Sequence, residues 1–295
     1  MDHNFFRGTC TALVTPFLDD KINYPMAEIL IKRQLDAGIR NIVLSGTTGE
    51  APTLSDDEKI TMFKRAKDFV GDDMCIIAGT GSNDTAYAVE LTKCACDLGY
   101  DGMLVVTPYY NKATQNGLIK MFTTIADAST VPVVLYNVPG RTGCNLLPTT
   151  VAKLADHPNI VGIKEASGNI SQIVKLMTLT DGNIDLYSGN DDQVVPLMSM
   201  GGLGVISVVS NIAPRAVHDM CDKMLKGDVK GAAQIQKDTL DLCENLFSEV
   251  NPIPAKAGVS AMGFGEENLR LPLTPMEDAT RAVLFAEMRK LGINV

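Results

Sequence analysis

One lysine of the 295-residue sequence directly follows an apolar run: Lys164, in the segment NIVGIKEASG. A lysine at such a place is in most proteins a solvated charge, and taken alone Lys164 would be interpreted in that way. An amine that is partly desolvated has a lowered pKa, however, and its neutral form attacks ketones to give a Schiff base. Lys164 is therefore a candidate nucleophile if the fold places it among apolar side chains.

Two other apolar runs end in tyrosines and an arginine. The segment TPYYN contains Tyr109 and Tyr110, and YNVPGRTG contains Tyr136 and Arg141. Tyrosines at strand ends more often pack than react, but a phenol held near a second hydroxyl can relay protons. The planar guanidinium group of Arg141 suits a substrate carboxylate. The pattern indicates chemistry on a small keto acid, of which pyruvate is the simplest.

Glycine-rich segments follow three further runs. SGTTGE contains Thr47 and Thr48, whose hydroxyls and neighbouring amides could hold a carboxylate, although an ordinary turn has the same composition. Gly189 follows the run IDLYS, where a missing side chain lets the backbone approach a ligand. The last run, GVISV, follows a glycine cluster of the kind that binds phosphate in barrel enzymes. Because no basic residue follows before Arg215, close packing is the favoured interpretation there.

Metal ligands are scarce in the sequence. Its histidines are His3, His157 and His218, none at ligand-like spacing to another, so we expect no metal site and no cofactor. Cys94 and Cys96 point to different faces of a predicted helix, and seven scattered cysteines favour reduced thiols. Aldol chemistry needs a metal or an amine to stabilise its carbanion, which leaves that task to the lysine.

Eight apolar runs alternate with helical patterns along the first part of the chain. The predicted strands are residues 11–15, 41–44, 75–78, 102–106, 133–136, 160–164, 184–188 and 204–208. Runs that are apolar throughout suit a parallel sheet buried on both faces, and eight such units predict an α/β fold, a (β/α)8 TIM barrel whose active site lies at the carboxyl ends of the strands. An open doubly wound sheet is the alternative, but after Gly79 and Gly81 its nucleotide motif would need a glycine where Asp84 stands. These glycines are interpreted as a tight turn.

Helix signals mark both the barrel and the C-terminal part of the chain. A helix is predicted over 25–37, another begins with a capping box between Ser55 and Glu58, and glycines such as Gly38 end helices. The barrel is predicted to occupy residues 1–225. Residues 226–295 form a small C-terminal helical extension, with helices over 229–246 and 275–291 separated by a connection at NPIPAK, and we expect it to pack without a chemical role.

Composition excludes several classes of partner. With 35 acidic and 26 basic residues the net charge is -9, which attracts neither nucleic acid nor anionic membranes. The N-terminal MDHNFFRGTC has no signal-peptide pattern, and no apolar run approaches the roughly 18 residues of a membrane span. We expect a cytoplasmic protein.

Taken together, GTTGE, PYYN, YNVPGRTG and GIKEASG closely resemble the dihydrodipicolinate (4-hydroxy-tetrahydrodipicolinate) synthase family of pyruvate-dependent lyases, over essentially the whole chain. The resemblance implies condensation of pyruvate with L-aspartate 4-semialdehyde, on the route to diaminopimelate and lysine. Lys164 is similar to the Schiff-base lysine, and Thr48, Tyr136 and Tyr110 match the catalytic proton relay, in which Tyr110 reaches in from an adjacent subunit. That implies a homo-oligomer, a dimer at least and in the family a tetramer built as a dimer of dimers.

The same resemblance implies the substrate contacts. Thr47 and Thr48 match the pair that meets the pyruvate carboxylate, and Arg141 matches the arginine that receives the carboxylate of the aldehyde. The backbone at Gly189 and Ile206 matches positions that line the pocket. The G-R-T-G ending at Arg141 distinguishes this chain from N-acetylneuraminate lyase, so another pyruvate-dependent or keto-deoxy sugar acid aldolase is the second candidate. A catalytically silent barrel and a phosphosugar isomerase are less favoured alternatives.

One departure from the family concerns regulation. Members inhibited by lysine often carry a histidine and a glutamate where this chain has Lys59 and Tyr87, although Asn83 and Tyr109 are retained. A cation and a neutral ring are poor hosts for the ammonium group of an effector. We therefore expect weak or no inhibition by lysine, and strong inhibition at low millimolar lysine in a steady-state assay would contradict this.

Overall fold

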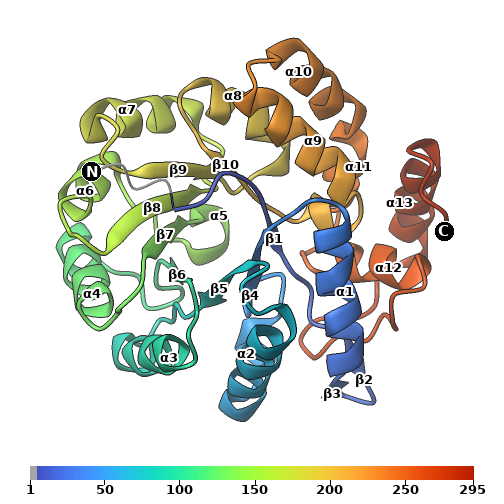
Figure 1. Cartoon of the computed structure of the whole chain (residues 1–295), viewed down its shortest axis with the longest axis horizontal. Coiled ribbons are helices and arrows are strands. Elements are labelled where there is room, and N and C mark those ends of the chain that lie inside the picture. Colours follow the sequence, from blue (N-terminus) through green and yellow to red (C-terminus); the bar gives the residue numbers. More distant parts are fainter. Residues whose placement is uncertain (1–4) are drawn as a thin grey trace.

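The centre of the molecule is a closed barrel of eight parallel strands (Figure 1), seen in the computed structural model, which describes residues 5–295. In chain order the strands are β1 Gly8–Ala12, β4 Asn41–Leu44, β5 Cys75–Gly79, β6 Gly102–Val106, β7 Val133–Asn137, β8 Ile160–Glu165, β9 Asp185–Ser188 and β10 Gly204–Ser207. Each pairs with the next, and β10 pairs with β1 to close the ring. The predicted (β/α)8 barrel is confirmed, and the doubly wound sheet is wrong.

A ring of helices covers the outside of the barrel (Figure 1). These are α1 Tyr24–Asp36, α2 Asp56–Val70, α3 Thr85–Asp97, α4 Gln115–Asp127, α6 Pro148–Leu154, α7 Ile170–Thr180, α8 Val194–Ser199 and α9 Pro214–Leu225. Shorter elements lie in the loops: the hairpin β2 Phe17–Leu18 and β3 Lys21–Ile22, the helix α5 Pro139–Thr142, and the 3-10 turns η1 Ala51–Thr53, η2 Asp191–Gln193 and η3 Val209–Asn211. The predicted capping box is confirmed at α2, where Glu58 N donates to Ser55 Oγ and Ser55 N donates to Glu58 Oε2.

Apolar side chains form two layers because each strand is buried on both faces. One cluster fills the barrel interior and includes Ile77, Leu104, Val134 and Ile206. The other lies between the sheet and the helices. Phe6 stacks on Tyr187 of β9 inside the barrel, with ring centroids 4.0 Å apart. The barrel is thus a packed core, and only the carboxyl ends of the strands are free to carry chemistry.

Four helices follow the barrel and lie along one side of it, orange to red in Figure 1. They are α10 Val229–Asp238, α11 Leu240–Asn245, α12 Ile253–Ala261 and α13 Asp278–Lys290. The single helix predicted over 229–246 is wrong, because it divides at Thr239, whose hydroxyl donates to the Ile235 carbonyl. The predicted connection at NPIPAK is also wrong in part, since most of it is the first turn of α12. Prolines are tolerated there because the first helical amides have no partner to lose.

The first strand lies three residues earlier than predicted. The run at 11–15 is apolar because Leu13 and Val14 are buried beyond the end of β1, each 2% exposed. Leu13 still donates its amide to the Val43 carbonyl, but regular pairing ends at Ala12. The apolar run correctly indicates buried residues here, but the buried segment continues beyond the end of β1.

Candidate functional site

Lys164 and Tyr136 lie side by side at the carboxyl ends of β8 and β7, where they are register partners. The Lys164 Nζ atom lies 4.3 Å from the centre of the Tyr136 ring, and the two residues are 5% and 7% exposed. Within residues 5–295 Lys164 forms no ion pair with a carboxylate. The predicted nucleophile is therefore a buried amine that packs against an aromatic face.

Gly189 makes room for the lysine side chain. A Cβ atom at this position would lie 3.1 Å from Lys164 Cε and 2.6 Å from the Cβ of Ala166. Ile206 is fully buried in the barrel interior, on β10. Gly189 thus belongs to the wall around Lys164 and is required there by close approach, whereas Ile206 is part of the apolar barrel interior.

Asp191 was not predicted, although it is fully buried beside this wall. Its carboxylate accepts hydrogen bonds from Ser207 Oγ at 2.5 Å and from the amides of Val208 and Val209 at 2.8 and 3.1 Å. Burial raises the pKa of Asp191, and the bonds from Ser207 and these amides, with the nearby Lys164 charge, oppose the shift. Asp191 therefore fixes the turn after β10. In the sequence, Asp191 is only the acidic residue at the end of YSGND, a composition typical of an ordinary turn.

A cavity of about 670 Å³ opens beside Tyr136. Its lining includes Thr47, Tyr136, Val138, Arg141, Lys59 and Tyr87. Lys164 is not part of the lining, but its amine lies 4.3 Å from the centre of the Tyr136 ring, which does line the cavity. The cavity thus brings together Thr47 from one predicted segment and Tyr136 and Arg141 from another, with the Lys164 amine next to the Tyr136 ring.

The two threonines of the segment 45–50 differ in their surroundings. Thr47 is half-buried and lines the cavity, whereas Thr48 is 3% exposed and lies outside the lining. Thr48 Oγ1 accepts a hydrogen bond from Asn251 Nδ2 at 3.0 Å. The tight-turn interpretation of Gly79 is wrong, because Gly79 is the last residue of β5; a side chain is excluded there by close approach of the backbone, since a Cβ atom would lie 2.2 Å from the Ser45 carbonyl oxygen.

Arg141 belongs to the short helix α5, which begins at Pro139. One of its terminal nitrogens donates to the backbone carbonyl of Asn251 at 3.2 Å. The C-terminal extension therefore reaches the site through Asn251, which corrects the expectation that it only packs. Sequence reasoning missed Asn251 because it lies in the segment interpreted as a connection.

Tyr110 lies away from the cavity of its own chain. Its side chain is 93% exposed and its backbone has a φ of 71°. The neighbouring Tyr109 does line the cavity, and its carbonyl accepts a bond from Asn83 Nδ2 at 3.2 Å. The loop thus turns the two adjacent tyrosines to different sides.

Lys59 and Tyr87 also line the cavity. Lys59 Nζ donates to the Tyr87 hydroxyl at 2.8 Å, and that hydroxyl donates to Asp56 Oδ1 at 2.5 Å. Burial lowers the pKa of Lys59, and the charge of Asp56 opposes the shift. The weak response to lysine stays a prediction.

Among residues 5–295, no group of three or more histidine, cysteine or acidic side chains gathers as metal ligands would. His3 lies outside the described residues. None of the helices in that part of the chain has both the length and the apolar character needed to span a membrane.

Comparison with known proteins assigns the family. The model of the dihydrodipicolinate synthetase family matches residues 5–290. The 4-hydroxy-tetrahydrodipicolinate synthase of Lachnoclostridium phytofermentans is 50% identical over 98% of this chain and 99% of its own. The dihydrodipicolinate synthase structure of Thermotoga maritima superposes with a TM-score of 0.96 at 41% identity, covering 98% and 99% of the chains. The enzyme of Acinetobacter baumannii complexed with pyruvate gives a TM-score of 0.95 at 42% identity, covering 97% and 99%. This chain belongs to the dihydrodipicolinate synthetase family.

Proposed function

We propose that this family member is a 4-hydroxy-tetrahydrodipicolinate synthase that condenses pyruvate with L-aspartate 4-semialdehyde on Lys164. The observation that carries the proposal is the buried Lys164 amine, 4.3 Å from the ring of Tyr136 and next to a cavity that also holds Arg141. The relatives named above carry the synthase name, which favours this lyase over a sugar acid aldolase. The A. baumannii structure is described as a pyruvate complex, which supports pyruvate as the first substrate.

The chemistry follows from an amine in an apolar site. The neutral amine of Lys164 attacks the ketone carbon of pyruvate, and loss of water gives an imine. Removal of a methyl proton then gives an enamine, whose carbon attacks the aldehyde to form the new carbon–carbon bond. Tyr136 is the proton carrier at this point, because its ring lies against Nζ and its side chain lines the cavity.

The relay also needs a hydroxyl that faces the cavity. The family resemblance implies this role for Thr48, but Thr47 is the threonine in the lining, while Thr48 is buried against Asn251. The arrangement favours Thr47 for the relay. Thr48, which like Lys164 lies outside the lining, keeps the role at the pyruvate carboxylate that the resemblance implies. A Thr47→Val variant should then lower kcat, and a Thr48→Val variant should mainly raise the KM for pyruvate.

Tyr110 is proposed to complete the relay of a second subunit. A tyrosine that is 93% exposed at a positive φ, away from its own cavity, has the geometry of a side chain inserted into a partner. We therefore propose a homo-oligomer, a dimer at least, with a tetramer of paired dimers as the assembly that the family resemblance implies. Sedimentation velocity distinguishes monomer, dimer and tetramer. A cytoplasmic location is likewise proposed and is tested by cell fractionation.

Borohydride reduction tests the proposed function. Protein incubated with pyruvate and reduced should gain the mass of one reduced pyruvate adduct, and peptide mapping should place it on Lys164. The adducted protein should lose activity with L-aspartate 4-semialdehyde. Absence of any adduct would remove the Schiff-base mechanism, and an adduct combined with preference for sugar aldehydes would favour the second candidate.

Arg141→Ala is expected to raise the KM for L-aspartate 4-semialdehyde roughly 10- to 100-fold, because a charge-assisted hydrogen bond to the substrate carboxylate is lost. The KM for pyruvate should change much less. Steady-state kinetics with each substrate varied in turn measures both. The matched control is Arg215→Ala, since exposed Arg215 on α9 donates to the Asp36 carbonyl and lies outside the cavity lining. An unchanged KM for the aldehyde would contradict the role of Arg141.

A further inference from the structure

The loop 46–50, which carries both threonines, is held by the C-terminal extension. Asn251 Nδ2 donates to Thr48 Oγ1 at 3.0 Å. Two residues later in the loop, the Glu50 carboxylate accepts bonds from Lys256 Nζ at 2.6 Å and from the Arg270 amide at 3.2 Å. These contacts join residues more than two hundred positions apart. The conformation of the loop therefore depends on residues outside the barrel.

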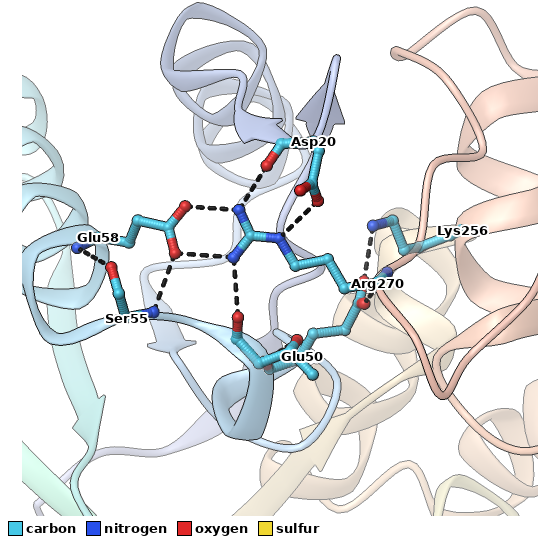
Figure 2. A network of polar contacts seen from close by, with 7 residues as sticks. Asp20, Glu50, Ser55, Glu58, Lys256 and Arg270 are labelled. Atoms are coloured by element: carbon cyan, nitrogen blue, oxygen red, sulfur yellow. Dashed lines mark hydrogen bonds and ion pairs between the residues drawn. The ribbon is translucent and has the colours of Figure 1, made fainter.

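Figure 2 shows how Arg270 extends this attachment. Its guanidinium group makes paired bonds of 2.7 and 2.6 Å to the Glu58 carboxylate and a third bond of 3.0 Å to Asp20. Mainly through the bonds from Arg270, the pKa of Glu58 falls to about 2. Arg270 also donates to the Thr53 carbonyl at 2.8 Å. The extension is thus anchored on both sides of η1, and it cannot move relative to the loop without breaking charged bonds.

Asn251 also contacts Arg141, the residue assigned to the carboxylate of the aldehyde. Its backbone carbonyl accepts the bond from Arg141, while its side chain bonds Thr48. The residue is 4% exposed. One buried residue therefore bridges the threonine assigned to pyruvate and the arginine assigned to the aldehyde, through two different groups.

We propose that Asn251 is a positioning residue that sets Thr48 for the carboxylate of the keto acid. Because Asn251 Nδ2 occupies an acceptor position on the Thr48 oxygen, the hydroxyl hydrogen points elsewhere and is free to donate to a ligand oxygen. Removing the amide leaves this hydroxyl free to rotate and without its partner. The inference rests on the proposed function, and it adds a residue from the extension to the pyruvate subsite.

The division between side chain and backbone gives the proposal a selective test. Asn251→Ala removes the bond to Thr48 but keeps the carbonyl that holds Arg141. We expect the KM for pyruvate to rise roughly 3- to 10-fold, as for loss of one hydrogen bond, with the KM for the aldehyde changed less than about 2-fold. The matched control is Asn245→Ala, because the Asn245 amide bonds the Asp241 carbonyl within α11. The control should keep both KM values.

A double-mutant cycle separates positioning from a general structural role. If Asn251 acts through Thr48, Asn251→Ala should add less than about 2-fold to the pyruvate KM of a Thr48→Val protein. Circular dichroism melting shows whether each variant folds. If Asn251→Ala does not fold, the isosteric Asn251→Asp variant replaces it, and its carboxylate should take the Thr48 hydrogen and raise the pyruvate KM at least as much.

The outcomes distinguish this inference from the proposed function. If borohydride traps no pyruvate on the unmodified enzyme, both fall together. If trapping succeeds but the Asn251 variants leave the pyruvate KM unchanged, or raise both KM values equally, the positioning role is overturned. Multiplicative effects of the Asn251 and Thr48 substitutions would also overturn it, because they would then act independently.

Discussion

Replacement of Lys164 by alanine is expected to reduce the condensation rate by at least about a thousandfold, since loss of a covalent nucleophile commonly costs that much or more. The reason is specific to this site. Lys164 is the amine next to Tyr136 and the cavity, and without it no imine with pyruvate can form. The measurements are kcat with both substrates and the borohydride adduct by peptide mass spectrometry. Both should be lost.

Two controls make this result interpretable. Lys164→Arg keeps a cation, but a guanidinium group does not form an imine with pyruvate. This variant should therefore be as inactive as the alanine variant. Lys175→Ala, on the exposed face of α7, should retain activity and the adduct. Substantial activity in Lys164→Arg would show that charge alone suffices, and the Schiff-base proposal would fail.

The Lys164 variant also tests whether Tyr110 acts across subunits. A Lys164→Ala subunit still carries Tyr110 and can supply it to a neighbour. Mixing it with a Tyr110→Phe protein, after dissociation and reassembly, should create sites that contain both an intact Lys164 and a donated Tyr110. Activity above that of either parent is expected. If the mixture is no more active than its parents, Tyr110 does not serve a partner's site.

The barrel and its central residues could be predicted because their signals are local. Eight apolar runs alternate with helices, and each strand end is adjacent in sequence to the residue it presents. Lys164 is the clearest case: the run IVGIK ends with it, and β8 places it beside Tyr136 on β7. Strand order alone was enough to bring these two together. Gly189 was predictable for the same reason, since it directly follows β9.

Asn251 and Asp191 could not be predicted in this way. The bond from Asn251 to Thr48 spans 203 positions, and nothing in the intervening sequence encodes the contact. Asp191 is a polar residue in a turn, where burial breaks the usual correlation between charge and exposure. Thr47 and Thr48 show a second limit of prediction from sequence. Adjacent residues of the same type share every sequence signal, and only the packing of the loop decides which hydroxyl lines the cavity.

The ion pair between Glu50 and Lys256 is expected to dominate the stability of the loop 46–50. The Lys256 side chain is 3% exposed, that of Glu50 is fully buried, and Lys256 Nζ also lies 4.1 Å from the centre of the Phe17 ring. Burial lowers the pKa of Lys256, and the Glu50 carboxylate opposes the shift. Lys256→Met leaves a buried carboxylate without its cation, which should lower the free energy of unfolding by about 3–5 kcal/mol. Urea denaturation measures this loss.

A double variant that removes both charges separates two contributions to stability: the destabilisation by an unpaired buried carboxylate, and the net stabilisation by the ion pair. Glu50→Gln combined with Lys256→Met should recover most of the lost stability, because neither buried site then carries a charge. The exposed pair of Lys223 and Asp228, 2.8 Å apart, provides the control, and Lys223→Met should leave the urea midpoint nearly unchanged. If the double variant is as unstable as Lys256→Met, the ion pair itself holds the loop. If the double variant regains its stability but its KM for pyruvate stays above that of the unmodified enzyme, Glu50 also orients the threonines.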